Sequence, residues 1–371
     1  MPRVLVINWQ DWTHPLAGGA EVHLREVFSR LARRGWEVTL LVSAFGGAAK
    51  RETMDGMRVV RVGSRDWFNF AVPLAYRRLS AECHFDIVVD DLNKIPFYTP
   101  VFAGKPVAAL VHHFFERSIF RETWLLPALY VYLAERFVAP VYRRSWFGAV
   151  SASTKQDLVR RGIPEARIRL VPNGVDCERY TPDEAGRAER PTVGYFGRLK
   201  RYKSVDHLIR AFRLILQEVP DAELLIVGEG DDRSRLERLS AQTGVRQHVA
   251  FTGKVTEEGK IRLLRRMWVC VNPSPKEGWG LTVTEANACG TPVVAADSPG
   301  LRDSVVAGVT GLLYPYGDLE ALSRNVVRIL RDGDLRRAMG QAAVEWARQH
   351  SWERAADCAE ELLLSALQER E

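Results

Sequence analysis

The sequence lacks long hydrophobic runs and closely spaced cysteines, and each absence removes a class of protein. Hydrophobic residues make up 46% of the 371 residues, yet no uninterrupted apolar run reaches bilayer length, so we expect no membrane-spanning helix. The apolar stretch near residue 1 ends at Asn8, too short for the hydrophobic region of a secretory signal. The five cysteines are widely separated, with no Cys-x-x-Cys pair, which argues against a disulfide framework or a cysteine-rich zinc site. We therefore expect a soluble protein of the reducing cytoplasm.

Charge is unevenly distributed along the chain. Residues 1–175 carry 24 basic and 16 acidic side chains, a net charge of +8, whereas residues 176–371 carry 28 and 30, a net charge of −2. Such asymmetry indicates a partner that only the first half contacts. An acidic substrate and a phospholipid surface both fit a basic half, and so does an ordinary solvated surface. Basic charge alone does not predict nucleic-acid binding, and we expect no nucleic-acid partner.

Short apolar, β-branched runs alternate with amphipathic helical stretches throughout the sequence. This alternation is typical of parallel strands in βαβ units, so we predict an α/β fold. The strands predicted in the first half are Arg3–Ile7, Glu37–Val42, Arg58–Val62, Asp86–Asp90, Val107–Val111, Phe147–Val150 and Ile168–Val171. Those predicted in the second half are Thr192–Phe196, Glu223–Val227, Val249–Phe251, Trp268–Val271 and Pro292–Ala295.

A polar stretch in the middle of the chain indicates a boundary between two domains. Residues 176–190 are polar, contain proline and glycine, and precede a new strand, as a linker would. We predict two doubly wound, Rossmann-like domains, residues 1–175 and 176–351, facing a central cleft. Ligands of such sheets bind at the carboxyl ends of the strands, so functional residues should follow strands directly.

The densest cluster of chemically informative residues is Pro273–Ala286, which begins where a predicted strand ends. Gly278 and Gly280 lack a Cβ, so the backbone there can approach a ligand closely. The helix that follows directs unpaired N–H groups at the loop, an arrangement suited to a pyrophosphate. Glu277 and Glu285, eight residues apart, can accept hydrogen bonds from sugar hydroxyls.

A second cluster, Gly197–Lys203 (GRLKRYK), directly follows the predicted strand 192–196. Arginine binds phosphate as a fork and lysine as a point charge, so together they can neutralise a departing diphosphate. The loop is not a Walker motif, because GxxxxGK[ST] is absent. A basic surface loop is the alternative, but the position at a strand's carboxyl end favours function.

These motifs together resemble the retaining glycosyltransferases of family 4, which have the GT-B fold. EGWGLTVTE resembles the family's EX7E signature, GRLKRYK its diphosphate-binding loop, and Val171–Asp176 its "PNGVD" segment. Val227–Gly230 and Phe251–Val255 look like the loops that frame the nucleoside. The resemblance covers essentially the whole chain. It also implies that a final helix, about residues 352–371, packs back on the first domain.

The resemblance implies a role for each matched residue. Arg198 and Lys203 would hold the donor diphosphate, Glu277 would contact the transferred sugar, and Glu285 would bind the ribose. Gly18 and Gly19 resemble the family's amino-terminal glycine loop, and residues 253–255 would line the base. The donor-binding positions implied in this way are Gly18, Gly19, Gly253, Lys254, Val255, Gly278, Trp279, Gly280, Leu281 and Glu285.

Two further positions are judged against the family pattern. His112 and His113 end the strand 107–111, and a family histidine at this place lies beside the donor sugar. His112 is the better match, and it completes the expected catalytic set of His112, Arg198, Lys203 and Glu277. Ser204 stands where the family often has glycine, and serine tolerates that turn unless its φ is positive.

The expected activity is hexosyl transfer from a nucleoside-diphosphate sugar, by default a UDP-sugar, to a hydroxyl group. No Asp-x-Asp motif follows a strand, and Asp90-Asp91 and Asp231-Asp232 are only adjacent pairs. No further Cys or His lies at ligand spacing from His112. We therefore expect metal-independent catalysis without a cofactor, the nucleotide-sugar being a co-substrate.

The acceptor is less clearly indicated. Residues 114–146 and 66–70 are rich in aromatic residues, with basic residues nearby such as Arg77, Arg78 and Arg136. Basic, aromatic amphipathic segments can rest in a membrane interface, so a glycan or lipid-linked glycan acceptor at the inner face of the membrane fits them. Aromatic residues that simply fill the first domain's core fit equally well.

Other functions compete with transfer. A catalytically degenerate GT-B protein could bind glycans or act as a scaffold, but the intact Arg198, Lys203 and Glu277 argue against it. A GT-B sugar-nucleotide epimerase is the second alternative. A nicotinamide dehydrogenase is disfavoured, because Gly228–Arg233 lacks the third glycine of GxGxxG.

Overall fold

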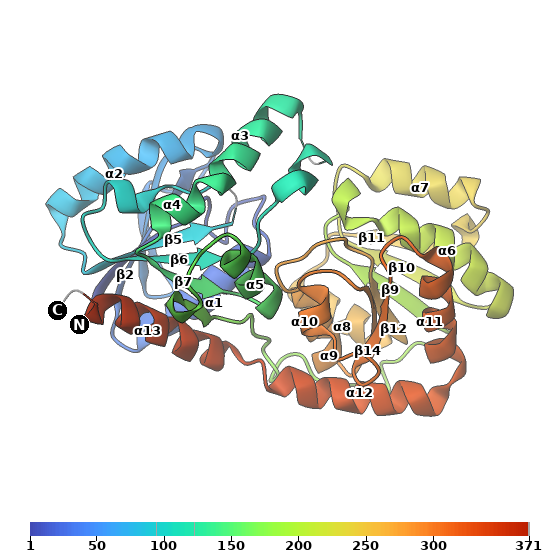
Figure 1. The fold of residues 1–371 in the computed structure, drawn as a ribbon. Helices are drawn as coiled ribbons and strands as arrows, with labels where there is room; N and C mark the ends of the chain where they lie inside the picture. The colour runs from blue at the N-terminus through green and yellow to red at the C-terminus, as the bar shows by residue number, and fades with distance from the viewer. Residues whose placement is uncertain (94, 122, 370–371) are drawn as a thin grey trace. The chain divides into compact units, whose positions relative to one another are not determined.

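The computed structural model describes residues 1–93, 95–121 and 123–369, which form two compact units. Unit 1 consists of Met1–Gly174 together with Trp352–Glu371, and unit 2 consists of Val175–Ser351. Each unit is a twisted sheet with helices packed on its faces (Figure 1). Among the described residues, no helix combines the length and the apolar character needed to cross a bilayer.

Unit 1 contains an eight-stranded sheet in the order β3-β4-β2-β1-β5-β6-β7-β8, parallel except for β3, which pairs antiparallel with β4. Its strands are β1 (Arg3–Ile7), β2 (Glu37–Ala44), β3 (Arg51–Met54), β4 (Met57–Ser64), β5 (Ile87–Leu92), β6 (Val107–Val111), β7 (Trp146–Ala149) and β8 (Ile168–Leu170). Its helices are α1 (Gly19–Arg33), α2 (Phe68–Glu82), α3 (Leu125–Arg136), α4 (Val138–Tyr142), α5 (Ala152–Arg160) and α13 (Trp352–Gln368).

Unit 2 contains a six-stranded, fully parallel sheet in the order β11-β10-β9-β12-β13-β14. Its strands are β9 (Thr192–Phe196), β10 (Glu223–Val227), β11 (Val249–Gly253), β12 (Val269–Asn272), β13 (Val293–Ala296) and β14 (Gly311–Tyr314). Its helices are α6 (Val205–Glu218), α7 (Arg233–Gln242), α8 (Glu257–Arg266), α9 (Leu281–Ala288), α10 (Leu301–Ser304), α11 (Leu319–Arg331) and α12 (Gly333–Arg348).

The α/β, doubly wound architecture predicted from the sequence is confirmed in both units. Every predicted strand exists, although most boundaries move by one or two residues. Two strands were missed. β3 is a short edge strand of exposed and half-buried residues, and β14 contains Gly311 and only four residues, so neither shows a long apolar run.

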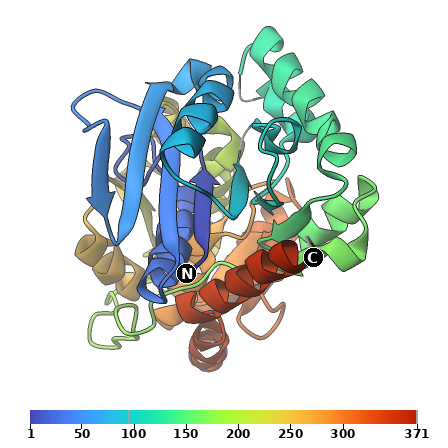
Figure 2. The same cartoon turned by 90° about the vertical axis from the view of Figure 1, so that its left-hand side faces the viewer.

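The last helix, α13, returns to unit 1 after the chain has passed through unit 2. The Trp36 indole N–H donates to Glu360 at 2.8 Å, and Arg34 pairs with Glu360 and Asp357. Leu362 packs so close to Gly148 in β7 that a Cβ there would lie 2.8 Å from it. In the views of Figures 1 and 2, this red helix runs alongside the strands of unit 1.

The polar segment 176–190 has no helix or strand, as a linker would, but it is packed onto unit 2. The Arg187 guanidinium donates to the carbonyls of Met267 and Gly290 and to the Thr291 hydroxyl. Burial lowers the pKa of Arg187, and these three acceptors compensate the cost of burying its charge. The segment is therefore a fixed part of unit 2.

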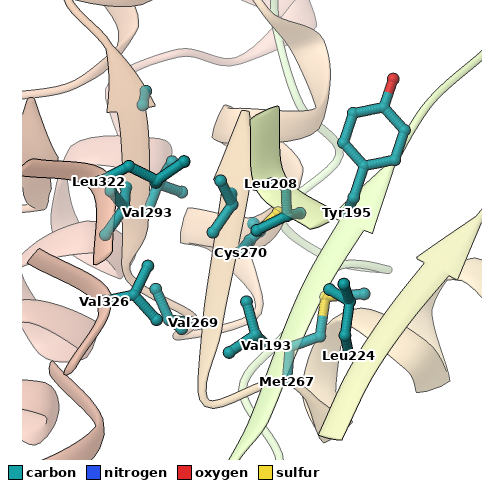
Figure 3. Packing of buried hydrophobic residues seen from close by; sticks show 14 of the residues in the cluster. Val193, Tyr195, Leu208, Leu224, Met267, Val269, Cys270, Val293, Leu322 and Val326 are labelled. Atoms are coloured by element: carbon teal, nitrogen blue, oxygen red, sulfur yellow. The ribbon is translucent and has the colours of Figure 1, made fainter. Parts of the chain in front are cut away.

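The core of unit 2 relies on close fitting between β9 and the neighbouring Met267 (Figure 3). Met267 is fully buried beside Gly194 of β9, and a Cβ on that glycine would lie 2.1 Å from the Met267 sulfur. The missing side chain of Gly194 thus makes room for the long side chain of Met267.

This fit predicts a specific pattern of stability in variants. Gly194→Ala should destabilise unit 2 by about 1–3 kcal/mol through overpacking, and Met267→Ala by about 2–5 kcal/mol through the cavity it leaves. The double variant should lose less than the sum of the two, because the new methyl group occupies part of the space vacated by Met267. Urea unfolding measures all three, and strict additivity would contradict the proposed fit.

Candidate functional site

The strand order of unit 2 determines where a ligand can bind. The chain starts at the central β9, proceeds to β10 and β11 on one side, and then crosses to β12, β13 and β14 on the other. In doubly wound sheets, ligands bind at the carboxyl ends of the two strands where the order reverses. These strands are β9 and β12, and the two motifs singled out from the sequence follow them directly.

The two loops meet through an ion pair. Lys203, after β9, places its Nζ atom 2.5 Å from Oε1 of Glu277, after β12, and each side chain is 15% exposed. The Lys203 ammonium also lies 5.0 Å from the centre of the Tyr202 ring. A cation and a carboxylate, partly shielded from water, are therefore brought together at the switch point.

Backbone contacts hold Glu277 in this position. Its amide N–H donates to the Pro299 carbonyl at 3.1 Å. Gly300 (φ +80°) lies against the loop so closely that a Cβ there would be 2.3 Å from the Glu277 carbonyl oxygen. Both the left-handed conformation and the close approach require glycine at residue 300.

Arg198 lies on the same loop as Lys203 but is exposed. Its guanidinium donates one hydrogen bond, at 3.2 Å, to the Tyr202 hydroxyl. The loop itself is supported from below, because Tyr195, buried in β9, donates its hydroxyl to the Arg198 carbonyl at 3.0 Å. Arg198 is thus a cation with donors open to an incoming anion.

Ser204 corrects one sequence-based expectation. Serine was expected to be tolerated unless φ is positive, and Ser204 has φ 54° and ψ 35°, in the left-handed region. This conformation costs a non-glycine residue about 1–2 kcal/mol. The Ser204 hydroxyl lies 2.9 Å from the Tyr316 hydroxyl, a hydrogen bond that offsets part of the cost and that glycine could not make.

The glycines after β10 serve the loop after β9. A Cβ on Gly228 would lie 2.0 Å from the Gly197 carbonyl oxygen, and one on Gly230 would lie 2.0 Å from the Leu199 carbonyl oxygen. Between them, Glu229 accepts a hydrogen bond from the Leu199 amide at 2.8 Å. The segment Val227–Gly230 therefore shapes the basic loop.

The EGWG segment presents its backbone outward and its large side chain inward. Trp279 is buried, donating its indole N–H to Thr284 at 2.8 Å, with its ring centre 5.1 Å from that of His350. Gly280 (φ +94°) turns the chain into α9, whose first residue is Leu281. Only the backbone of Gly278, Trp279 and Gly280 is thus left to face a ligand.

Glu285, in α9, is paired with a residue that the sequence reading missed. Lys260 of α8 forms an ion pair with Glu285, and both side chains are largely buried. The Tyr180 hydroxyl lies 3.5 Å from the same carboxylate and hydrogen-bonds to Glu257. Burial and the neighbouring carboxylates, Glu285 first, raise the pKa of Tyr180. No sequence signal distinguishes Lys260 from the other basic residues of α8.

The loop after β11 closes the set of predicted positions in unit 2. Gly253 (φ +75°) ends the strand, and its carbonyl accepts from the Gly228 amide at 3.0 Å. Lys254 is exposed, and Val255 is half-buried against the core. The loops after β9, β10 and β11 are therefore hydrogen-bonded to one another in sequence.

Unit 1 has its own switch point, between β1 and β5. Gly18 and Gly19 stand at the start of α1, where the Gly18 amide donates to the buried Glu21 carboxylate at 2.6 Å. Asn93, after β5, donates to Asn8, after β1, at 2.7 Å. Asn93 also donates to Glu21 at 3.4 Å, which links the ends of both strands to the glycine loop.

A buried ion pair anchors the approach to that loop. Arg61 of β4 donates to Asp11 at 2.7 Å, and both side chains are almost fully buried. Burial alone would raise the pKa of Asp11, but the hydrogen bonds from Arg61 and Thr13 lower it overall. The charged carboxylate is therefore the form that holds residues 8–18 in place.

The two histidines after β6 have different surroundings. His112 is buried, with Nε2 2.9 Å from Oδ1 of Asp91, and its carbonyl accepts from the Thr154 hydroxyl. His113 is half-buried with its ring 4.8 Å from that of Phe115. Asp90, beside Asp91 in β5, does not face His112. Its carboxylate accepts hydrogen bonds from the hydroxyls of Tyr142 and Thr99.

His23 is a second buried residue that the sequence reading missed. Its ring centre lies 5.3 Å from that of His112 and 6.0 Å from that of Trp352 at the start of α13. Burial, followed by the charge of His112, lowers the pKa of His23 to about 3. In the sequence, a single histidine at a core position of the amphipathic α1 does not indicate that it contacts His112 and Trp352.

Family models match the chain on both sides of its boundary. The model described as Glycosyltransferase Family 4 matches residues 17–179, and the one described as Glycosyl transferases group 1 matches residues 178–346. Together the two models span most of the chain, which belongs to glycosyltransferase family 4, so the family named from the sequence is confirmed.

Curated relatives match only part of the chain. A D-inositol 3-phosphate glycosyltransferase of Corynebacterium jeikeium is 32% identical over 213 residues, 53% of this chain and 51% of that protein. A GDP-mannose-dependent alpha-(1-6)-phosphatidylinositol monomannoside mannosyltransferase of Mycolicibacterium smegmatis is 35% identical over 214 residues, 53% of this chain and 56% of that protein. The aligned region thus spans about half the length of these relatives.

Solved structures match almost the whole fold. Sucrose-phosphate synthase from Thermosynechococcus elongatus has a TM-score of 0.84 at 23% identity, covering 98% of this chain and 99% of that one. Anabaena HepE in complex with UDP and glucose has a TM-score of 0.79 at 19% identity, covering 98% and 100%. Together with the family models, these neighbours confirm the predicted GT-B fold.

The low pKa of His23 predicts a pH dependence of stability. Between pH 6.5 and about 3, the unfolded chain binds a proton at His23 and the folded chain does not. Stability should therefore fall as pH falls through this range, by up to about 1.4 kcal/mol per pH unit from this residue. Urea unfolding between pH 7 and 5 should show a shallower slope in His23→Gln. Equal slopes would contradict this account.

Proposed function

We propose that this protein transfers a hexosyl group from a nucleoside-diphosphate sugar to a hydroxyl of a glycan or lipid-linked glycan acceptor, with retention of configuration and without a metal. The observation that carries the proposal is the Lys203–Glu277 ion pair at the switch point of unit 2. A cation for the diphosphate and a carboxylate for the sugar stand side by side there, next to the exposed Arg198.

Donor binding would exchange the partners of this pair. The diphosphate would take over the Lys203 ammonium, and Glu277 would then accept hydrogen bonds from the sugar hydroxyls. In transfer, the bond between the anomeric carbon and the diphosphate oxygen breaks, and a bond from that carbon to the acceptor oxygen forms on the same face. The acceptor's proton passes to the departing diphosphate. Arg198, Lys203 and the amides at the start of α9 would stabilise its growing charge.

The remaining residues would position the donor. Glu285 would bind the ribose, with its carboxylate held in place by the ion pair with Lys260. Gly253, Lys254 and Val255 would line the base. In unit 1, Gly18 and Gly19 would approach the diphosphate, and His112, whose Nε2 lies 2.9 Å from Oδ1 of Asp91, would contact the transferred sugar.

The proposal also specifies a donor nucleotide and a class of acceptor. UDP is the donor nucleotide predicted from the sequence. GDP is the alternative, because one relative that is 35% identical is named a GDP-mannose-dependent enzyme. That relative's name specifies a phosphatidylinositol mannoside acceptor. A lipid-linked acceptor at the inner membrane face is therefore the acceptor class we propose.

A thermal-shift screen identifies the donor. UDP, GDP, ADP and TDP, each with its common sugars, would be added in the presence of magnesium or of a chelator. At about one hundred times its dissociation constant, a ligand that binds only the folded state adds about 2.7 kcal/mol. We expect the ligands of one nucleotide to raise the melting temperature of the protein, equally with magnesium and with the chelator. A shift that needs magnesium would contradict metal independence, and no shift with any nucleotide would contradict the donor site.

Two substitutions test the catalytic assignment. Glu277→Ala and Arg198→Ala should each lower turnover about 100-fold or more, the scale for removing one stabilising group from a transition state. The melting temperature should change little in Arg198→Ala, because Arg198 is exposed. It should fall in Glu277→Ala without loss of the fold, because Lys203 loses its partner in a largely buried ion pair. Lys200→Ala is the matched control, since Lys200 lies on the same loop but pairs with Asp231. Wild-type turnover in either test variant, measured by release of the nucleotide, would overturn the assignment.

A further inference from the structure

We infer that an exposed apolar and basic surface of unit 1, formed by α3 and the start of α2, docks on an anionic lipid bilayer. We call it the α2–α3 face. The inference deepens the proposed function, because a lipid-linked acceptor would lie at such a bilayer. It is nevertheless a separate claim, since docking requires neither donor binding nor transfer.

The first part of the face is α3, whose apolar stripe points away from the core. Leu126, Leu129, Leu133 and Phe137 recur at the spacing of one helical face, and all four are exposed. A helix of a globular protein normally turns such a stripe inward. Here the helix buries small or polar residues instead, Ala128, Ala134 and Glu135.

Trp124, just before α3, extends this stripe. Its side chain is 87% exposed, and Leu126 at the start of the helix is 78% exposed, so large apolar side chains stand almost completely in water. Contiguous exposed apolar surface of this kind marks an interaction site in a soluble protein. The expectation that these aromatic residues fill the core of unit 1 is wrong for Trp124 and for Phe137.

The start of α2 adds a second apolar stripe. Trp67, Phe70 and Leu74 lie on one face of the chain as it enters the helix, all three exposed, and the rings of Trp67 and Phe70 are 5.8 Å apart. Asn69 donates a hydrogen bond to the Tyr130 hydroxyl of α3 at 2.6 Å. The start of α2 and the middle of α3 are therefore neighbours, and Figure 1 shows the two helices on the same part of unit 1.

Basic residues continue these apolar stripes. Arg77 and Arg78 follow Leu74 on the same side of α2, and Arg136 lies on the exposed side of α3. In the part of the chain that the structure describes, neither Arg77 nor Arg78 has a carboxylate partner. The Arg136 guanidinium donates to the Tyr132 hydroxyl at 2.7 Å and lies over that ring.

This combination favours a bilayer over a second copy of the chain. Tryptophan and tyrosine prefer the level of the lipid headgroups, leucine and phenylalanine enter the acyl region, and long arginine side chains reach the anionic headgroups. A second copy docked on the same face would instead bring the positively charged arginines of the two copies together. Unit 1, residues 1–174 with 352–371, has 26 basic and 22 acidic side chains, and this net charge of +4 adds long-range attraction to an anionic surface.

Vesicle flotation tests the inference with the full chain. We expect the protein to float with vesicles of phosphatidylcholine mixed with phosphatidylglycerol, less with phosphatidylcholine alone, and less again in high salt. Leu126→Ser with Leu133→Ser should weaken partitioning at least about 100-fold, because two leucines no longer enter the bilayer. Arg77→Gln with Arg78→Gln should weaken binding to the anionic vesicles roughly 30-fold.

Matched controls come from exposed residues elsewhere. Leu364→Ser on α13 and Arg210→Gln with Arg213→Gln on α6 remove residues of the same types, and they should float like wild type. Wild-type flotation of the α2–α3 variants, or no flotation of wild type with anionic vesicles, would overturn the inference. So would a dimer, detected by light scattering, that the leucine variant loses, since it would assign the face to a second copy.

Two further measurements separate docking from catalysis. Brominated lipids should quench the fluorescence of wild type more strongly than that of Trp124→Phe, because Trp124 enters the bilayer; equal quenching would contradict its insertion. The leucine and arginine variants should keep the wild-type thermal shift with nucleotide, and Glu277→Ala should still float. Failure of flotation with an intact nucleotide shift therefore refutes docking and leaves the proposed transfer standing.

Discussion

The ion pair between Lys203 and Glu277 joins the two loops on which the proposed chemistry of unit 2 depends. It exists because β9 and β12 are adjacent in a sheet whose order reverses between them, so residues 74 positions apart in sequence meet at 2.5 Å. Without a ligand, each charge is neutralised by the other in a site partly shielded from water. The pair thus holds both side chains at the switch point until a ligand exchanges their partners.

The loops around this pair are shaped more by backbone fit than by side-chain contacts. Gly228 and Gly230 leave room for carbonyl oxygens of the basic loop, and Gly300 leaves room for that of Glu277. Any side chain at these positions would displace a peptide group, and displacing it would move a charged residue. In unit 1 the same task falls to side chains, because the buried Asp11–Arg61 pair fixes the segment that leads to Gly18. The two sites are therefore positioned by different physical means.

The sequence could predict the fold and the loops but not all of the contacts. Apolar runs of β-branched residues identify strands directly, and parallel strands place whatever follows them at one edge, so Arg198, Lys203 and Glu277 could be assigned to loops at that edge. Lys260 could not be found, because its pairing with Glu285 depends on how α8 packs on α9. His23 was missed for the same reason, since its burial depends on α13, more than 300 residues later. The outward stripe of α3 was equally hidden, because periodicity shows that a helix has an apolar face but not which way it points.

The return of α13 to unit 1 has a consequence for how the protein is made. Unit 1 is the first to leave the ribosome, yet Trp352, Glu360 and Leu362 all contribute to its packing. Until residues 352–369 have been synthesised, the surface around Trp36 and Gly148 lacks its covering helix, whereas unit 2 already has every segment it needs. The usual order of biosynthetic folding, in which the amino-terminal domain matures first, is thereby reversed: the part translated first is the last to be completed.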